Sequence, residues 1–276
     1  MKMFKKVVIF GTGLIGGSLG LALKRKDLAK RVIGLSRHKK NAKLALEIGA
    51  IDQIGTSLRV VRDADLVILA TPINSIMEIA LKIVKNLKKD CIVIDVGSTK
   101  EKIVSRLSTL IPNFVGCHPL AGSEKKGILN GRGNIFTGSI CIITPIAKTK
   151  KNTLNKIKLL WAELGTQVIM LTPARHDQIL AFTSHLPHAV AFSLMGSIPD
   201  KFLGLSSSGL KDATRISGSD ALLWSEIFLS NRKNLLVSIS SFQQKLAALK
   251  LALKNKDMGR LTKILSVAKE KREQLG

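Results

Sequence analysis

The stretch 7-VVIFGTGLIGGSLG-20 decides the fold of this chain. Its apolar start predicts a buried strand, and glycines follow at the spacing Gly11-x-Gly13-x-x-Gly16. In a strand–turn–helix unit the first glycine permits the tight turn, the second lets the backbone approach a pyrophosphate, and the third lets the helix pack on the strand. The N-terminus of the helix then offers free N–H groups to the phosphates. The predicted cofactor contacts of this turn are Gly11, Gly13, Leu14, Ile15 and Gly16.

Short apolar runs alternate with amphipathic helical segments as far as residue 172, which is the pattern of a parallel sheet with crossover helices. Beyond that point the spacing is helical throughout. We therefore predict an α/β fold, with a Rossmann-type dinucleotide-binding domain over residues 1–172 and an all-helical domain over residues 173–276. Strands are expected at 7–10, 31–36, 65–70, 91–95, 114–117, 139–143 and 167–171, and the later helices at 173–182, 187–196, 221–253 and 258–271.

The net charge of +25 raises the question of a nucleic-acid partner. The lysines are scattered over every segment, however, and aromatic residues for base stacking are scarce, with nine Phe, two Trp and no Tyr. We therefore expect solvated basic faces, no nucleic-acid partner, and a field that favours an anionic small-molecule substrate.

Hydropathy and cysteine content place the protein in the cytoplasm. No run of about 18 apolar residues occurs, so no membrane association is expected. The three cysteines, Cys91, Cys117 and Cys141, are far apart and form no CxxC pair. We expect them to be buried, reduced thiols, and no Cys/His cluster has the spacing of a metal site.

The end of the second strand, 32-VIGLSRHKK-40, predicts which dinucleotide binds. An NAD site places an acidic residue about 20 positions past the glycines, where it accepts hydrogen bonds from the ribose hydroxyls. This chain has Ser36 and Arg37 there, and a carboxylate would repel a 2′-phosphate that these two side chains can bind. We therefore predict NADP, with NAD less favoured.

Polar residues follow three of the predicted strands at the sheet edge where open α/β sheets bind ligands. Thr71 and Pro72 follow the strand expected at 65–70, Ser98 follows the one at 91–95, and His118 follows the one at 114–117. Removing a hydride from a carbon that bears a hydroxyl requires a base beside that hydroxyl, and a neutral imidazole suits this task. We predict that His118 is catalytic and that Ser98 orients the imidazole or the substrate. The turn after His118 adds two further polar residues, Ser123 and Glu124.

The helical part offers two cations that share a helix face, Lys211 and Arg215, four residues apart. They are either an exposed basic face balanced by Asp212 or a clamp for a dicarboxylate, since arginine binds carboxylates through two hydrogen bonds. The same part carries His185, His188 and Trp224.

Several motifs together resemble one family, the prephenate/arogenate dehydrogenases of tyrosine biosynthesis. They are the glycine turn and the segments 95-DVGSTK-100, 118-HPLAGSEKKG-127, 183-TSHLPHAVAF-192 and 209-GLKDATRISGSDALLW-224, in the expected order over nearly the whole chain. The resemblance implies an oxidative decarboxylation: NAD(P)⁺ takes a hydride from the ring carbon bearing the hydroxyl, and the ring carboxylate leaves as CO₂. It also implies a helical dimerisation domain, a homodimer and, with no chorismate mutase or ligand-sensing segment recognised, a monofunctional form.

Matching positions carry the family's roles onto this chain. His118 resembles the catalytic histidine that hydrogen-bonds the 4-hydroxyl, with Ser98 assisting. Arg215 resembles the arginine that binds a substrate carboxylate, with Lys211 nearby, and His188 resembles the histidine at the substrate entrance. The remaining pocket residues implied by the resemblance are Ser123 and Glu124.

The resemblance leaves the substrate open. Ser36 and Arg37 are similar to NADP-using members, several of which prefer arogenate, whereas His188 is similar to prephenate-using ones. Two other functions remain as alternatives. One is an NADP-dependent reductase of the β-hydroxyacid or pyrroline-carboxylate type, although the glycine-rich helix with a catalytic lysine expected of a hydroxyacid enzyme is missing. The other is a basic nucleotide-sensing protein without chemistry.

Overall fold

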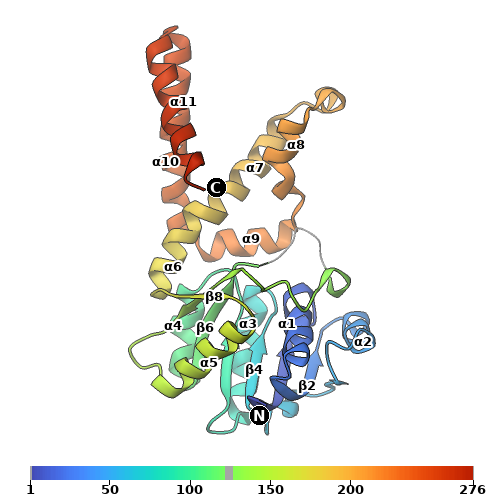
Figure 1. Ribbon diagram of the computed structural model, residues 1–276. Coiled ribbons are helices and arrows are strands. Elements are labelled where there is room, and N and C mark those ends of the chain that lie inside the picture. Colours follow the sequence, from blue (N-terminus) through green and yellow to red (C-terminus); the bar gives the residue numbers. More distant parts are fainter. Residues whose placement is uncertain (1, 122–126, 276) are drawn as a thin grey trace. The chain divides into compact units, whose positions relative to one another are not determined.

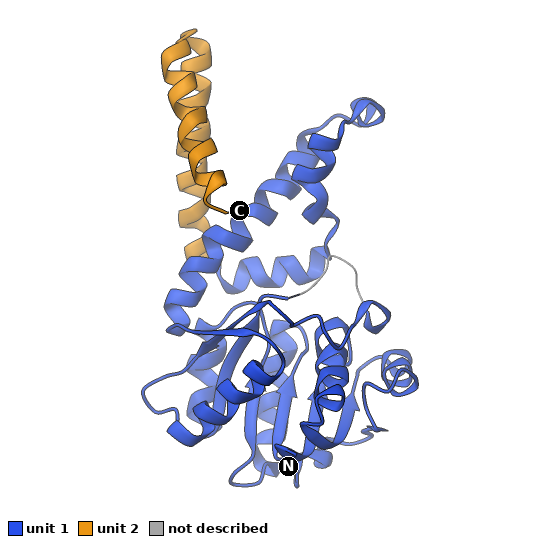
Figure 2. Ribbon diagram, viewed as in Figure 1, with its two compact units in different colours: residues 1–231 blue, residues 232–276 orange. Residues whose placement is uncertain are grey.

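The computed structural model describes residues 2–121 and 127–275. Its chain forms two compact units, Met1–Asn231 and Arg232–Gly276 (Figure 2). The predicted residues Ser123 and Glu124 lie outside the described residues.

The first unit contains one eight-stranded sheet, with the order β3-β2-β1-β4-β5-β6-β7-β8 (Figure 1). The strands are β1 (Phe4–Phe10), β2 (Ala29–Leu35), β3 (Gln53–Ile54), β4 (Leu66–Leu69), β5 (Ile92–Asp95), β6 (Phe114–Pro119), β7 (Ile140–Thr144) and β8 (Gln167–Met170). Strands β1 to β6 are parallel, as the alternating pattern predicts.

The parallel pattern ends after β6, where the structure differs from the expectation. Strand β7 pairs with β6 in the antiparallel sense, Gly116 facing Thr144, and β8 runs parallel to β7. Parallel neighbours need a long crossover, usually a helix. The described part of the β6–β7 connection contains only the short 3₁₀ turn Ile128–Asn130, so the chain turns back and pairs directly.

Alternate side chains of each central strand fill two different cores. On β1, Val7 and Ile9 face one core and Val8 and Phe10 face the other. Helices α1 (Leu14–Arg25), α2 (Lys39–Glu47) and α5 (Lys151–Glu163) cover the first face, and α3 (Ile73–Ile83) and α4 (Glu101–Leu110) cover the second. Because both faces are covered, the strands are apolar at nearly every position.

A helical segment follows β8 and packs on the sheet within the same unit. It comprises α6 (Pro173–Leu180), a π-helical turn (Ala181–His185), α7 (Leu186–Ser197), α8 (Ser208–Thr214) and α9 (Ala221–Ser230). The Asp177 carboxylate on α6 accepts hydrogen bonds from the backbone N–H groups of Lys100 and Glu101, and Thr99 Oγ1 lies 2.9 Å from Ser230 Oγ. These bonds explain why the first compact unit extends to Asn231; the domain boundary after residue 172 stays a prediction.

The helix predicted over 221–253 is two helices. Helix α9 ends at Ser230, and α10 (Arg232–Lys254) begins after Asn231. The Asn231 side chain is buried, and its Nδ2 donates to the main-chain oxygen of Asp177 at 2.6 Å. A buried side-chain amide needs a hydrogen-bond partner, and the bond to Asp177 fixes the direction of the chain at Asn231. The helical spacing of the sequence alone predicts that the helix continues through this residue.

The second unit is a pair of helices, α10 and α11 (Met258–Glu273). They are joined by a turn in which Lys256 has a positive φ of 54° and Asp257 caps α11 by accepting from Arg260 N. Several large apolar side chains of this unit are exposed, among them Leu236, Val237, Leu246, Leu253, Met258 and Leu265.

The stretch Pro173–Ser197, which runs through α6, the π-helical turn and α7, is long and apolar enough to cross a membrane by length and composition alone. The core helix of a soluble protein passes the same test. This stretch carries His176, Asp177 and His185 as buried side chains, and Asp177 is bonded to the sheet domain. We therefore treat it as part of the wall of the cavity described next.

Candidate active site

The turn between β1 and α1 forms a cradle that only glycine fits at two of its positions. Gly11 has a φ of +92°, and a Cβ there would lie 2.3 Å from the Ala70 oxygen. A Cβ at Gly16 would lie 1.9 Å from the Gly11 oxygen. Gly13 differs, because a Cβ there would meet nothing within 4 Å. The first and third glycines are thus required by packing, and the space beside the second is open to a ligand.

The groups around this turn fit the phosphates of a dinucleotide. Helix α1 begins after Gly13 with no side-chain cap and with no acidic residue in its first turn, so its first N–H groups are available to an anion. The buried Thr71 Oγ1, at the end of β4, has no hydrogen-bond partner among the described residues. Thr71 also lines the cavity described below.

The end of β2 carries hydroxyl and basic side chains. Ser36 Oγ accepts from His38 N at 3.3 Å, and the Arg37 side chain is exposed. Helix α2 starts at Lys39, with His38 as its N-cap, no side-chain cap bond and no acid in its first turn. The described β2–α2 turn therefore presents basic and hydroxyl groups only.

A cavity of about 940 Å³ lies at the carboxyl ends of the strands, between the cradle and the helices that follow β8. Most of the predicted site residues line it: Gly13, Leu14, Ile15, Thr71, Pro72, Ser98, His118, His188 and Arg215. Lys211 is exposed on α8 and is not in the cavity wall. Ser36 and Arg37 also lie outside the wall, as expected for groups at the far end of a dinucleotide.

His118 is the end of a chain of three side chains. Its Nδ1 lies 2.8 Å from His176 Nε2, and His176 Nδ1 lies 2.7 Å from Asp177 Oδ1. Burial holds the pKa of His118 well below its usual value, and the neighbouring His176 and Lys100 lower it further. The His118 ring is therefore neutral at pH 7, which is the state a general base requires.

Asp177 is ionised although it is buried. Burial alone raises a carboxyl pKa, but hydrogen bonds from His176 and from the backbone N–H groups of Glu101 and Lys100 lower the pKa of Asp177 below its usual value. The two backbone bonds measure 2.9 and 2.7 Å and come from the N-terminus of α4, whose dipole also favours the negative charge.

A buried ion pair lies beneath the site. Lys100 and Asp95 are fully buried and joined by a hydrogen bond between Nζ and Oδ2. Burial raises the pKa of Asp95 in spite of this partner. The Lys100 ammonium contributes to the lowered pKa values of both His118 and His176, so it opposes protonation of either ring.

His188 and Trp224 form one wall of the cavity. Their rings are stacked, with centroids 3.4 Å apart and an angle of 20° between planes. His188 Nδ1 donates to the Ser184 oxygen at 3.0 Å, so Nε2 of the neutral ring is an acceptor. Burial lowers the pKa of His188, and Arg215 lowers it further. The ring thus offers a fixed acceptor beside the Arg215 cation.

Reasoning from the sequence missed His176, Asp177 and the buried role of Lys100. The histidine and aspartate are adjacent in 173-PARHDQIL-180, which reads only as the start of an amphipathic helix. Nothing local indicates that this turn faces the end of β6, which lies 58 residues earlier. The position of Lys100 in 95-DVGSTK-100, five residues after a buried aspartate, is a signal that could have been used.

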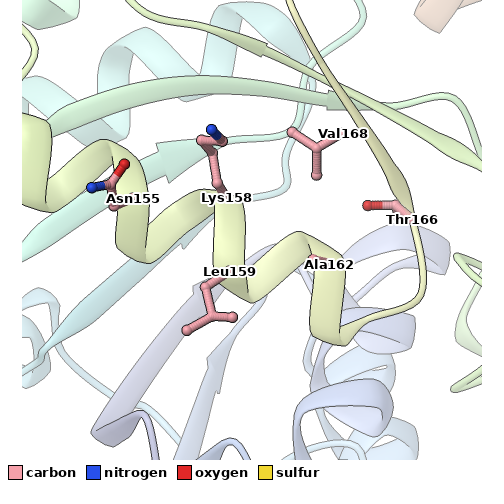
Figure 3. A pocket seen from close by; sticks show the side chains of 6 residues that line it. All are labelled: Asn155, Lys158, Leu159, Ala162, Thr166 and Val168. Atoms are coloured by element: carbon pink, nitrogen blue, oxygen red, sulfur yellow. The ribbon is translucent and has the colours of Figure 1, made fainter.

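A second, smaller cavity of about 390 Å³ lies between α5 and β8, lined by Asn155, Lys158, Leu159, Ala162, Thr166 and Val168 (Figure 3). Thr166 Oγ1 already donates to the Trp161 oxygen at 2.8 Å. The lining groups form no acid–base pair, and we assign no function to this cavity. Within residues 2–121 and 127–275, no group of three or more His, Cys, Asp or Glu side chains could hold a metal ion.

The sequence matches two family descriptions in tandem. "Prephenate dehydrogenase, nucleotide-binding domain" covers residues 19–170, and "Prephenate dehydrogenase, dimerization domain" covers residues 172–267. A cyclohexadienyl dehydrogenase of Zymomonas mobilis is 33% identical over 269 residues, which are 93% of this chain and 91% of that protein.

Solved structures of a prephenate dehydrogenase and an arogenate dehydrogenase are also similar to this chain. The prephenate dehydrogenase of A. aeolicus in complex with hydroxyphenyl propionate and NAD⁺ is similar with a TM-score of 0.93 and 34% identity, over 99% of this chain and 98% of that one. The Synechocystis arogenate dehydrogenase has a TM-score of 0.84 and 30% identity, over 98% and 100%. A pyrroline carboxylate reductase of Plasmodium falciparum, with a TM-score of 0.52, 12% identity and coverage of 100% and 94%, shares the fold alone.

The two glycines of the cradle are expected to respond differently to alanine. Gly11→Ala forces a side chain into the Ala70 backbone at positive φ, and it should lower the free energy of unfolding by about 1–3 kcal/mol. Gly13→Ala should leave the unfolding free energy nearly unchanged but weaken dinucleotide binding, because its Cβ fills the space open to the pyrophosphate. Denaturant unfolding and cofactor titration separate the two effects. Unchanged cofactor affinity in Gly13→Ala would contradict the position assigned to the pyrophosphate.

Proposed function

Because this chain belongs to the prephenate dehydrogenase family, we propose that it catalyses the NADP-dependent oxidative decarboxylation of prephenate or arogenate. The observation that carries the proposal is the position of His118. A neutral imidazole lines the same cavity as the glycine cradle, so a base and a dinucleotide can meet one substrate. The nucleotide-sensing alternative offers no reason for this arrangement.

The proposed reaction assigns one proton transfer to His118. The bound dinucleotide supplies the hydride acceptor. The His118 Nε2 removes the proton of the ring hydroxyl as the carbon–hydrogen bond at that carbon breaks. The bond between the ring and its carboxylate then breaks, its electron pair enters the ring, and CO₂ leaves. Aromatisation drives the step, and no further oxidant is needed.

Arg215, His188 and Ser98 are proposed to bind and orient the substrate. All three line the cavity. Arg215 provides a cation for the carboxylate of the side chain, and His188 provides the neighbouring acceptor. The hydroxyphenyl propionate in the A. aeolicus complex combines a phenol and a carboxylate in the same way as the product expected here. Lys211, Ser123 and Glu124 stay proposals drawn from the resemblance.

NADP is proposed on the residues that follow β2. Ser36 and Arg37 stand where a carboxylate would bind the ribose of NAD, and the first turn of α2 has no acid. The A. aeolicus relative was solved with NAD⁺, so the choice rests on these residues of this chain.

A homodimer in the cytoplasm is proposed for the assembly and its place in the cell. The C-terminal match is described as a dimerization domain, and the second unit exposes apolar side chains that a partner copy would cover. The three cysteines are free and buried, which fits a reducing compartment. We keep residues 1–172 as the proposed dinucleotide domain and 173–276 as the proposed substrate and dimerisation domain.

Replacing the base tests the proposed chemistry. His118→Asn should lower kcat by about 10²–10⁴-fold with prephenate or arogenate, because a general base of this kind contributes that factor. Cofactor binding, measured by fluorescence titration, should be unchanged. Turnover close to that of the unaltered protein would contradict the role of His118.

Replacing the hydroxyl after β2 tests the cofactor choice. Ser36→Asp places a carboxylate beside the 2′-phosphate and should lower kcat/KM for NADP⁺ relative to NAD⁺ at least about tenfold, which corresponds to about 1.4 kcal/mol. Ser105→Asp, on the exposed face of α4, makes the same charge change away from the cavity and should leave the ratio unaltered. An unaltered ratio in both variants would remove Ser36 from the 2′-phosphate site.

A further inference from the structure

We propose that His176 and Asp177 are positioning residues, which hold His118 in the tautomer that carries its proton on Nδ1 and leaves Nε2 free to accept a proton. The proposal rests on the proposed function, in which His118 is the base. It adds two residues, both from the segment after β8, to the machinery that makes this base competent.

The donor and the acceptor of each hydrogen bond can be assigned in turn, starting from Asp177. Its Oδ1 accepts from Lys100 N at 2.7 Å, and its Oδ2 accepts from Glu101 N at 2.9 Å. The main-chain oxygen of Asp177 accepts from Asn231 Nδ2, which holds the residue from the other side. An ionised carboxylate has no proton to give, so the bond of 2.7 Å to His176 requires the proton to be on His176 Nδ1.

The position of the proton on His176 in turn fixes the position of the proton on His118. The His176 ring is fully buried and neutral, since burial lowers its pKa, so with a proton on Nδ1 its Nε2 can only accept. The bond of 2.8 Å between His176 Nε2 and His118 Nδ1 therefore requires the proton on His118 Nδ1. We call the hydrogen-bonded chain of Asp177, His176 and His118 the relay. In the neutral His118 ring, Nε2 is then an acceptor on the side opposite the relay, and His118 lines the cavity.

The charged and titratable groups around His118 favour one protonation state, in which His118 and His176 are neutral and Asp177 is ionised. The fully buried Lys100 ammonium, held by Asp95, opposes the addition of a proton to either ring. Burial lowers the pKa of the neighbouring His185 to about 4, so this ring is also neutral at pH 7. With both histidines neutral and Asp177 charged, one pattern of donors and acceptors satisfies every atom of the relay.

The relay matters because a free imidazole exchanges between two neutral tautomers. With the proton on Nε2, His118 would present a donor to the substrate hydroxyl and could not remove its proton. When His118 takes the proton during the reaction, its Nδ1–H still donates to His176, and Asp177 stabilises the positive charge through that ring. The relay thus selects the reactive tautomer before the reaction and supports the imidazolium after it.

Nitrogen-15 NMR of histidine-labelled protein at neutral pH tests the tautomer without any assay of activity. His118→Asn identifies the His118 signals by their loss. We expect an Nδ1 that carries a proton and an Nε2 that does not, in a single tautomer. A proton on Nε2, or an averaged signal from both tautomers, would overturn the proposal.

Variants of His176 test the consequence for catalysis. His176→Leu removes the acceptor and should lower kcat on the order of 10²-fold, with a smaller change in KM. In His176→Gln the side-chain carbonyl can accept from His118 Nδ1, so this variant should recover most of the lost kcat and the single tautomer. Arg175→Gln, on the exposed part of the same helix, is the matched control and should match the unaltered protein. Equal kcat in Leu and Gln variants that both fold would contradict a role through hydrogen bonding.

The two parts of the test separate this proposal from the proposed function. If the unaltered protein oxidises neither prephenate nor arogenate, the function fails, and the NMR result still decides whether the relay fixes the tautomer. If turnover is observed but His118 carries its proton on Nε2, the relay fails and the function stands.

Discussion

The bonds between Asp177 and the first turn of α4 are the contact on which the site depends. They join the helical segment after β8 to the sheet, because Asp177 lies on α6 and its acceptors meet the backbone N–H groups of Lys100 and Glu101. The same carboxylate holds His176, which holds His118. One buried charge therefore bonds α6 to the sheet and, through His176, reaches His118, the residue that we propose as the base.

Such a contact is costly to bury and therefore must be well satisfied. An ionised carboxylate in a protein interior is stable only when hydrogen bonds replace the water it loses. Asp177 receives three on its two oxygens, and the positive end of α4 adds to them. The neighbouring pair of Lys100 and Asp95 is likewise fully buried. Beneath the site lie the Asp177 carboxylate, held by hydrogen bonds, and the Lys100–Asp95 pair, while Arg215 provides a cation in the cavity wall.

The sequence predicts those features of the fold and of the site that depend on local patterns of residues. The glycine spacing and the strand–helix alternation predict the cradle, and the rule that ligands bind at carboxyl ends of strands places His118 and Ser98 in the cavity. Long-range contacts were missed. His176 and Asp177 reach the site only because α6 returns to the sheet. The direction of β7 goes with a β6–β7 connection whose described residues form no crossover helix, and the end of α9 depends on an amide that bonds Asp177.

We propose above all that a neutral His118 and a bound dinucleotide act on the same ring substrate. The direct measurement is the rate of nicotinamide reduction by the purified protein, with NADP⁺ and NAD⁺ each combined with prephenate and with arogenate. We expect reduction of the nicotinamide with at least one of the two substrates, at a higher rate with NADP⁺, and release of one CO₂ for each nicotinamide reduced. No reduction in any of the four combinations would contradict it.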